Sequence, residues 1–199
     1  MLITSISGIR GTIGGAEGEG LTPHDIVRFA TGYASWVKSS SGQEQPTVVV
    51  GRDARLSGEL VRDCLVGTLN AMGVNVLDLG LSTTPTVELA VPAESAAGGI
   101  ILTASHNPKQ WNALKLLGPS GEFLNAAEGD RVLVLSSIKT TYADIKDIGY
   151  TEHLAGWLET HVDHALDLEL VDAAAIKAKG LKIAVDAVNS TGGIIMPML

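Results

Sequence analysis

The chain has 199 residues and carries 14 Lys and Arg side chains against 22 Asp and Glu, so its formal net charge is −8. Hydrophobic residues make up 45% of the chain and charged residues 18%, a balance that excludes an intrinsically disordered protein. The acidic excess argues against nucleic acid or an anionic membrane as the main partner, and no apolar run is long enough to span a bilayer.

The N-terminal region is expected to contain a loop and then a helix. It shows no basic segment followed by an apolar run, which would mark a signal peptide, so we expect a cytoplasmic protein. Six of the 23 glycines lie within residues 8–20, where we expect a loop with tight backbone turns. Thr22 and Pro23 suit the N-cap and first position of a helix, which continues to the polar segment 38–42.

Strands and helices alternate in the middle of the chain. We expect strands at 47–50, 74–79 and 99–102, helices at 57–72 and 85–91, and a turn at 118–121 between the extended segments 114–117 and 122–124. Buried strands that alternate with helices are typical of an α/β domain whose sheet is covered on both faces. The pattern therefore predicts a three-layer αβα domain with a mostly parallel, mixed sheet.

The pattern changes near residue 142. Apolar residues at helical intervals predict helices over 150–168 and 172–179, and 181–185 is expected to form a strand that leads into a glycine-rich turn. This order indicates the start of a second α/β domain. We therefore expect a first domain over residues 1–148 and the beginning of a second over 149–199.

Three of the arginines lie in glycine-bearing loops: Arg10, Arg52 and Arg55. Glycine allows backbone N–H groups to approach an anion, and the guanidinium group matches the geometry of phosphate oxygens. These loops are therefore candidates for a phosphate site. The alternative is that the arginines form ion pairs with nearby acidic side chains at positions 53, 59 and 63.

A third polar loop, residues 103–108, follows a buried strand. In open α/β sheets the loops at the carboxyl ends of strands line the ligand crevice. Ser105 offers a nucleophilic oxygen, His106 a titratable donor and Asn107 the start of a stiff Asn-Pro turn. The loop is neither the Gly-x-Ser-x-Gly elbow of serine hydrolases nor a P-loop, and composition alone favours an ordinary polar turn.

The sequence Thr-Ala-Ser-His-Asn-Pro at 103–108, followed by Trp-Asn-Ala-Leu-Lys at 111–115, resembles the active-site serine loop of the α-D-phosphohexomutases. Ser-Gly-Ile-Arg-Gly at 7–11 and Gly-Arg-Asp-Ala-Arg at 51–55 resemble two further elements of that family, in the same order. Residues 185–189 resemble the opening strand of the family's second domain. Together, these matches indicate the N-terminal portion of such an enzyme.

The resemblance implies roles for individual residues. Ser105 would carry the phosphoryl group that passes to and from the sugar through a bisphosphorylated intermediate. His106, Lys115 and Arg10 would neutralise charge and transfer protons, although adjacent residues on an extended chain point apart, so we do not expect His106 to act as a simple base for Ser105. The positions that the resemblance assigns to substrate or phosphate binding are Ser7, Gly8, Arg10, Arg52, Arg55 and Asn107.

The resemblance also implies a cofactor and a substrate class. Mg²⁺ would bind partly through the phosphate on Ser105, with its main ligands outside this chain, because the family's Asp-Gly-Asp-x-Asp-Arg cluster has no counterpart here. The substrate would be a hexose phosphate or hexosamine phosphate. The opening segment favours phosphoglucosamine mutase activity, with phosphomannomutase or phosphoglucomutase activity as the alternative.

Two other classes of function stay open at this stage. A non-catalytic module that binds sugar phosphates would use the same residues, and a serine hydrolase would acylate Ser105. For the mutase, we expect that the 199-residue chain alone has no useful turnover. The sequence does not indicate an oligomeric state.

Overall fold

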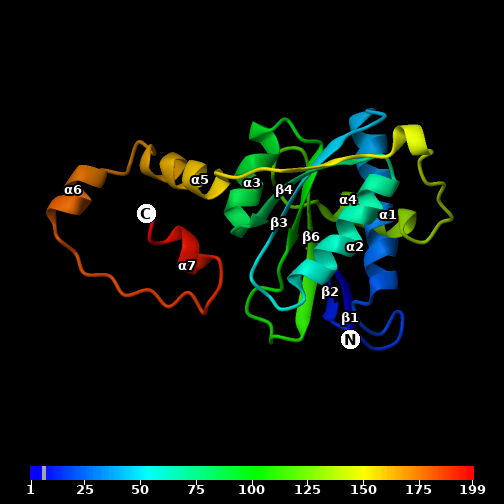
Figure 1. Cartoon of the computed structure of the whole chain (residues 1–199), viewed down its shortest axis with the longest axis horizontal. Coiled ribbons are helices and arrows are strands. Elements are labelled where there is room, and N and C mark those ends of the chain that lie inside the picture. The colour runs from blue at the N-terminus through cyan, green and yellow to red at the C-terminus, as the bar shows by residue number, and fades with distance from the viewer. Residues whose placement is uncertain (6–7) are drawn as a thin grey trace.

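The computed structural model describes residues 1–5 and 8–199, and they form a mixed α/β fold (Figure 1). Across this part of the chain, one seven-stranded sheet has the order β1-β2-β6-β5-β3-β4-β7. The strands are β1 Leu2–Ser5, β2 Gly8–Thr12, β3 Thr47–Arg52, β4 Asn75–Leu81, β5 Gly98–Leu102, β6 Trp111–Leu117 and β7 Thr151–His153. The pairs among β5, β3, β4 and β7 are parallel, and those among β1, β2, β6 and β5 are antiparallel. The predicted mixed sheet is confirmed.

Helices cover both faces of this sheet (Figure 1). They are α1 Pro23–Ser41, α2 Gly58–Ala71, α3 Thr84–Ala93, α4 Ala126–Leu135, α5 Trp157–Leu166, α6 Ala173–Ala178 and α7 Gly192–Ile195, with a 3₁₀ turn at Ile145–Asp147. Helix α1 packs between α2 and α4 on one face, whereas α3 lies on the other face with α5 against it. The predicted three-layer arrangement is confirmed.

Strand β3 shows why the sheet must be covered twice. Val48 and Val50 belong to the core under α1 and α2, and Val49 belongs to the core under α3. All three side chains are fully buried. Because successive side chains of a strand point to opposite faces, a run of valines is stable only when both faces are shielded from water.

Helix α1 begins and ends as the sequence predicts. Thr22 is the N-cap and forms a reciprocal capping box with Asp25, and Pro23 occupies the first helical position. Gly42 closes the helix in a left-handed conformation, with its N–H donating to the carbonyl of Lys38. The local signals were sufficient here because each acts within one helical turn.

Three expected elements differ from the structure. Part of the expected loop 8–20 is strand β2, whose backbone groups pair with β1 and β6. The expected helix over 150–168 is divided into β7, which pairs with β4, and α5. Residues 181–185 are not a strand; they are exposed and have no neighbouring strand to supply hydrogen bonds. In all three segments, the presence or absence of a distant strand with which to form backbone hydrogen bonds determined the structure.

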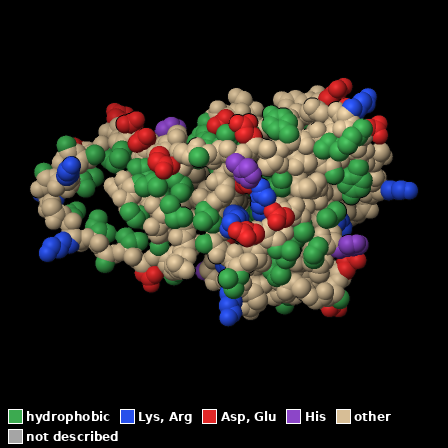
Figure 2. All heavy atoms as spheres, viewed as in Figure 1, with side chains coloured by type: hydrophobic (Ala, Val, Ile, Leu, Met, Phe, Trp, Pro, Cys, Tyr) green, Lys and Arg blue, Asp and Glu red, His purple; other side chains and the backbone are tan. Residues whose placement is uncertain are grey.

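The C-terminal segment extends from α5 as an arm away from the sheet, and α7 turns back beside α5 (Figure 1). Hydrophobic side chains are exposed along this arm (Figure 2). They include Leu168, Leu170, Ile176, Leu181, Ile183, Val185 and Val188. Among the described residues, every helix is too short or too polar to cross a bilayer.

Candidate functional site

The site lies where β3 and β5 end side by side. These strands are parallel neighbours, with Arg52 paired to Leu102, so the loops that follow them emerge at the same edge of the sheet. The Asp53 N–H donates to the carbonyl of Leu102 at 3.1 Å and joins the two loops at their base. We call residues 103–110 the serine loop.

A cavity of about 190 Å³ opens beside the serine loop. Most of the residues predicted for the site line it: Gly8, Arg10, Ser105, His106, Asn107 and Lys115. Ser7, the remaining candidate from the first motif, lies outside the described residues. The structure therefore brings together residues that are separated by about one hundred positions in the sequence.

Strands β2 and β6 carry two cationic side chains that line this cavity, Arg10 on β2 and Lys115 on β6. Arg10 pairs with Ala113 across the antiparallel ladder, and Lys115 lies two residues beyond Ala113 on the same strand. Side chains two positions apart on a strand project from the same face, so Arg10 and Lys115 point toward the same side of the sheet. Gly8 approaches this strand so closely that a Cβ atom would lie 2.3 Å from the carbonyl oxygen of Leu114.

Ser105 and His106 do not follow the extended geometry that the sequence analysis assumed. Ser105 has φ of +52°, in the left-handed region, and its exposed hydroxyl lies 3.5 Å from Nδ1 of His106. The expectation that the two side chains point apart was wrong, because the backbone turns sharply at Ser105. At 3.5 Å the contact is long for a hydrogen bond, yet it places the imidazole beside the nucleophilic oxygen.

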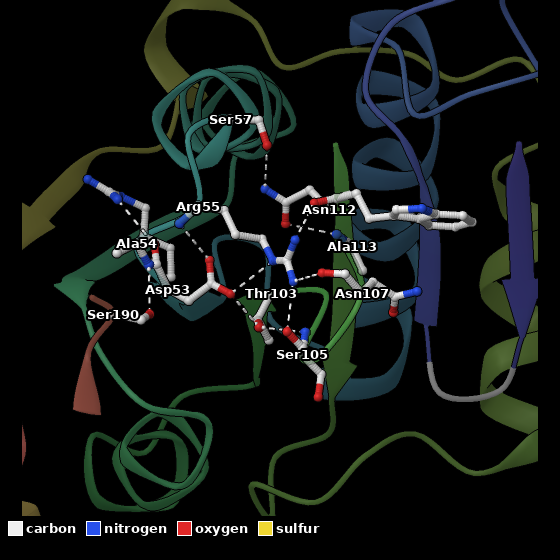
Figure 3. Close-up of polar contacts among 12 residues, drawn as sticks. Asp53, Ala54, Arg55, Ser57, Thr103, Ser105, Asn107, Asn112, Ala113 and Ser190 are labelled. Carbon is white, nitrogen blue, oxygen red and sulfur yellow. Dashed lines mark hydrogen bonds and ion pairs between the residues drawn. The ribbon is translucent and has the colours of Figure 1, made fainter. Parts of the chain in front are cut away.

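Arg52 and Arg55 have protein partners in the structure. Arg52 forms an ion pair with Glu59 at 3.1 Å and donates to the backbone carbonyl of Asp53. Arg55 lies beside Asp53 and donates to backbone carbonyls of the serine loop (Figure 3). Both arginines thus form ion pairs with acidic residues, as the alternative prediction has it. That either arginine binds phosphate remains a prediction.

Asp53 and Thr103 are part of the site although the sequence analysis did not select them. The Thr103 hydroxyl donates to Asp53 at 2.6 Å and accepts the N–H of Ser105 at 3.1 Å (Figure 3). Both residues lie inside the motifs that carried the family resemblance, which was the available signal. Their contacts are tertiary, since the two positions are 50 residues apart.

Phe123 is a third residue of the site that the sequence analysis did not select. It lines the cavity together with Lys115, and it also lines a neighbouring hollow that contains Glu88 of α3. Burial raises the pKa of Glu88, and the positive charge of Lys115 acts in the opposite direction. The ring reaches the cavity because the turn at 118–121 folds the chain back along β6.

The turn that begins α7 faces the serine loop across a groove of about 650 Å³. Val188, Asn189 and Ser190 form one wall, and residues 53–56, 105–107 and 109 form the other. Ser190 Oγ accepts the N–H of Ala54 at 3.4 Å (Figure 3). Part of the arm therefore lies beside the candidate site.

A larger hollow, of about 1060 Å³, lies at the opposite edge of the sheet, next to the residues that precede β3 and β4. It is lined by three lysines and three acidic residues, among others, and Ser105 is not one of its lining residues. The described residues contain no cluster of three or more His, Cys, Asp or Glu able to hold a metal ion. The polar side chains that line the cavity beside Ser105 include those of Arg10, His106 and Lys115.

Comparison with known proteins identifies relatives of the whole chain. The domain family described as phosphoglucomutase/phosphomannomutase, alpha/beta/alpha domain I, matches residues 2–139. A phosphoglucomutase/phosphomannomutase of Thermococcus kodakarensis is 33% identical over 95% of the chain and 41% of its own length. A phosphoglucosamine mutase of Levilactobacillus brevis is 34% identical over 91% of the chain and 40% of its own length. The chain thus spans about two fifths of these relatives.

The fold also matches a solved structure. The parafusin of Paramecium, a phosphoglucomutase crystallised in an open form, superposes with a TM-score of 0.75 over 98% of this chain and 41% of its own. Sequence identity in this match is 18%, so the likeness concerns the fold alone. Because the match covers 98% of this chain, it includes most of the C-terminal segment that follows α5 as well as the seven-stranded sheet.

Proposed function

Because the chain belongs to the phosphoglucomutase/phosphomannomutase family, we propose that it forms the catalytic-serine part of a phosphohexomutase. Such an enzyme interconverts hexose 6-phosphate and hexose 1-phosphate. The observation that carries the proposal is the exposed hydroxyl of Ser105 beside a cavity that Arg10, His106 and Lys115 also line. Residues 1–148 would be the first domain and residues 149–199 the beginning of the second.

In the proposed reaction, Ser105 alternates between a phosphorylated and a free state. The phosphoryl group leaves Oγ for the free hydroxyl of a hexose monophosphate, which loses its proton as the new P–O bond forms and the serine P–O bond breaks. The product is a hexose bisphosphate. The hexose bisphosphate then reorients in the site. Its other phosphoryl group is transferred to Oγ of Ser105, and the hexose monophosphate that keeps the newly added phosphate is released.

The surrounding cations suit this transfer. Phosphoryl transfer depends mainly on alignment and on charge stabilisation, because negative charge spreads over the equatorial oxygens in the transition state. Arg10 and Lys115 project from the same face of the sheet and would neutralise that charge, with Gly8 and Asn107 beside the phosphate. His106, which is 3.5 Å from Oγ, is the candidate for moving the proton of the sugar hydroxyl.

Mg²⁺ is the proposed cofactor, and we propose that its main ligands lie outside the described residues. The described residues offer no three-ligand cluster, and the carboxylate of Asp53 accepts hydrogen bonds from the Thr103 hydroxyl and from the Arg55 backbone. A phosphate on Ser105 would be the chain's own ligand to the ion. When bound, Mg²⁺ would offset phosphate charge, and no step above is derived from it.

The substrate we favour is a hexosamine phosphate, as in phosphoglucosamine mutase, with mannose and glucose phosphates as alternatives. Relatives of both kinds have similar identity to this chain. We place the enzyme in the cytoplasm. Turnover of glucosamine, mannose and glucose 6-phosphates by the intact natural protein ranks the three substrates directly.

The decisive experiment follows the phosphoryl group. The intact natural protein is incubated with glucose 1,6-bisphosphate, and peptide mass spectrometry locates any added phosphoryl group. We expect it on Ser105, and we expect neither the adduct nor mutase activity in Ser105→Ala. Mutase activity in the Ser105→Ala protein would refute the mechanism. Binding of the bisphosphate without a phosphoserine would identify a non-catalytic sugar-phosphate module instead.

A further inference from the structure

Arg55 makes an unusual set of contacts beneath the serine loop (Figure 3). Its two Nη atoms donate four hydrogen bonds to backbone carbonyls: those of Ser105 at 2.7 Å, Asn107 at 2.8 Å, Pro108 at 2.9 Å and Trp111 at 2.9 Å. The fifth donor, Nε, lies 3.3 Å from the carboxylate of Asp53. A guanidinium group has five N–H donors. Four of them are hydrogen-bonded to these carbonyls, whereas the Nε–H is buried and forms no hydrogen bond among the described residues, so no donor is left that is both free and accessible to a phosphate.

Asp53 and Thr103 hold the other side of the same loop. Oδ1 of Asp53 accepts the backbone N–H of Arg55 at 3.0 Å, and Oδ2 accepts the Thr103 hydroxyl at 2.6 Å. Thr103 in turn accepts the N–H of Ser105 at 3.1 Å. The Arg55 side chain is only 10% exposed, so the guanidinium group is largely shielded from water.

These contacts clamp the backbone on both sides of Ser105. Its N–H is held by Thr103 and its C=O by Arg55, which together orient the two peptide groups that flank the residue. Between them Ser105 has φ of +52°, a conformation that residues with a Cβ atom rarely adopt. Such a conformation persists only when the surrounding contacts impose it.

We propose that Arg55 is a positioning residue: it sets the left-handed backbone of Ser105, and so the direction of the reactive hydroxyl, rather than binding substrate phosphate. The role of that hydroxyl rests on the proposed function, whereas the clamp itself does not. Lysine at this position keeps the charge but donates from a single nitrogen atom, which cannot reach four carbonyls. Arg55→Lys therefore separates positioning from charge.

The first test measures amide hydrogen exchange in the 199-residue chain. Arg55→Lys and Arg55→Met are expected to speed exchange of the Ser105, Asn107 and Trp111 amides by about tenfold or more, and to similar extents. Arg131→Lys, which changes an exposed arginine on α4, is the control and should leave them unchanged. Unchanged loop exchange in both Arg55 variants overturns the proposal.

A second variant, Thr103→Val, tests the contacts around Ser105 if the Arg55 variants fail to fold. Thr103→Val is nearly isosteric and removes both the acceptor of the Ser105 N–H and the donor to Asp53. Exchange of the Ser105 amide is therefore expected to rise while the rest of the sheet stays protected. Equal protection of Ser105 in wild type and Thr103→Val overturns the clamp.

The kinetic test uses the intact natural protein and its hexose phosphate substrate. A misdirected nucleophile is expected to lower kcat of Arg55→Lys by about a hundredfold, with KM changed by less than about threefold. A KM raised by about tenfold with kcat retained would instead make Arg55 a phosphate ligand and overturn the proposal. If Ser105 accepts no phosphoryl group, the proposed function fails, and the exchange experiment still reports on the clamp.

Discussion

The ammonium nitrogen of Lys115 lies over the ring of Phe123, 5.5 Å from its centroid. The two residues come from β6 and from the segment that returns along it, where Phe123 bridges to Leu117. Both residues line the cavity beside Ser105, so the ring restricts the positions that the Lys115 ammonium group can occupy in that cavity. The short turn at 118–121 thus has a consequence for the charge distribution of the site.

This contact predicts an energetic coupling between the two side chains. A cation held over an aromatic ring at an exposed site contributes about 0.5–1 kcal/mol. A double-mutant cycle of Lys115→Met and Phe123→Leu, measured by urea unfolding, is expected to give a coupling of about that size. Phe123→Tyr keeps the ring and serves as the control. Strictly additive effects of the two substitutions would contradict the interaction.

Asp25 is expected to make the fold sensitive to acid. Burial raises the pKa of this carboxyl, but hydrogen bonds from Thr22 and Gly18 and the charge of Arg28 outweigh burial and hold the pKa below its ordinary value of 3.8. With the folded-state pKa lowered, the unfolded chain takes up the proton first. The stabilisation is therefore present above about pH 3.8 and is lost as the pH falls through the folded-state pKa.

Asp25→Asn tests this assignment. The variant is expected to lose about 1–3 kcal/mol of unfolding free energy at neutral pH, because buried N–H and O–H donors lose a charged acceptor. Its stability should also decline less than that of wild type on acidification. Asp130→Asn, at an exposed position of α4, is the matched control. An acid limb that is identical in wild type and Asp25→Asn would contradict the role of Asp25.

Tyr33 ties helix α1 to the sheet. Its hydroxyl is fully buried and lies 2.7 Å from the carbonyl oxygen of Leu117 and 3.1 Å from that of Gly99. Tyr33→Phe is expected to cost about 0.5–1.5 kcal/mol in chemical denaturation. Tyr142→Phe, which alters an exposed tyrosine, is the control. A Tyr33→Phe protein as stable as wild type would show that the hydroxyl contributes nothing net.

The same hydroxyl predicts an alkaline limb of stability. Burial raises the pKa of Tyr33, although the hydrogen bond to Gly99 acts in the opposite direction. Since the folded-state pKa is raised, the stabilisation is complete below the ordinary value of 10.0 and is lost as the pH rises above it. Phenolate absorbance should show one tyrosine that ionises only on unfolding. That component should be missing in Tyr33→Phe.

Gly8 is expected to resist substitution for a reason of packing as well as of backbone conformation. It has φ of +119°, and an added Cβ would lie 2.3 Å from the Leu114 carbonyl oxygen. Gly14 has φ of +88° with nothing within 4 Å of the added atom, so Gly14→Ala reports the backbone cost alone. That cost is about 1–2 kcal/mol, and Gly8→Ala should exceed it by about 1–3 kcal/mol in thermal or urea unfolding. Equal losses would mean that β2 and β6 can separate.

The sequence was most informative where its signals act over a few residues. The capping residues of α1, the valine run of β3 and the turn at 118–121 were all predicted from local patterns. The glycine-rich segment was expected to be a loop, yet part of it became β2 because β1 and β6 supply hydrogen-bond partners. Similarly, 151–153 became a strand because β4 had an open edge.

For the candidate site, the sequence by itself determined which chemical groups are present: a serine, a histidine, a lysine and three loop arginines. Tertiary structure decided their roles. It gathered Arg10, Ser105 and Lys115 at one cavity. It also directed Arg55 toward carbonyl oxygens of the serine loop, although Arg55 and Ser105 are 50 positions apart in the sequence. The physical reason is that residue type and periodicity are local properties, whereas the partners of a strand edge or a guanidinium group depend on which distant segments the fold brings into contact.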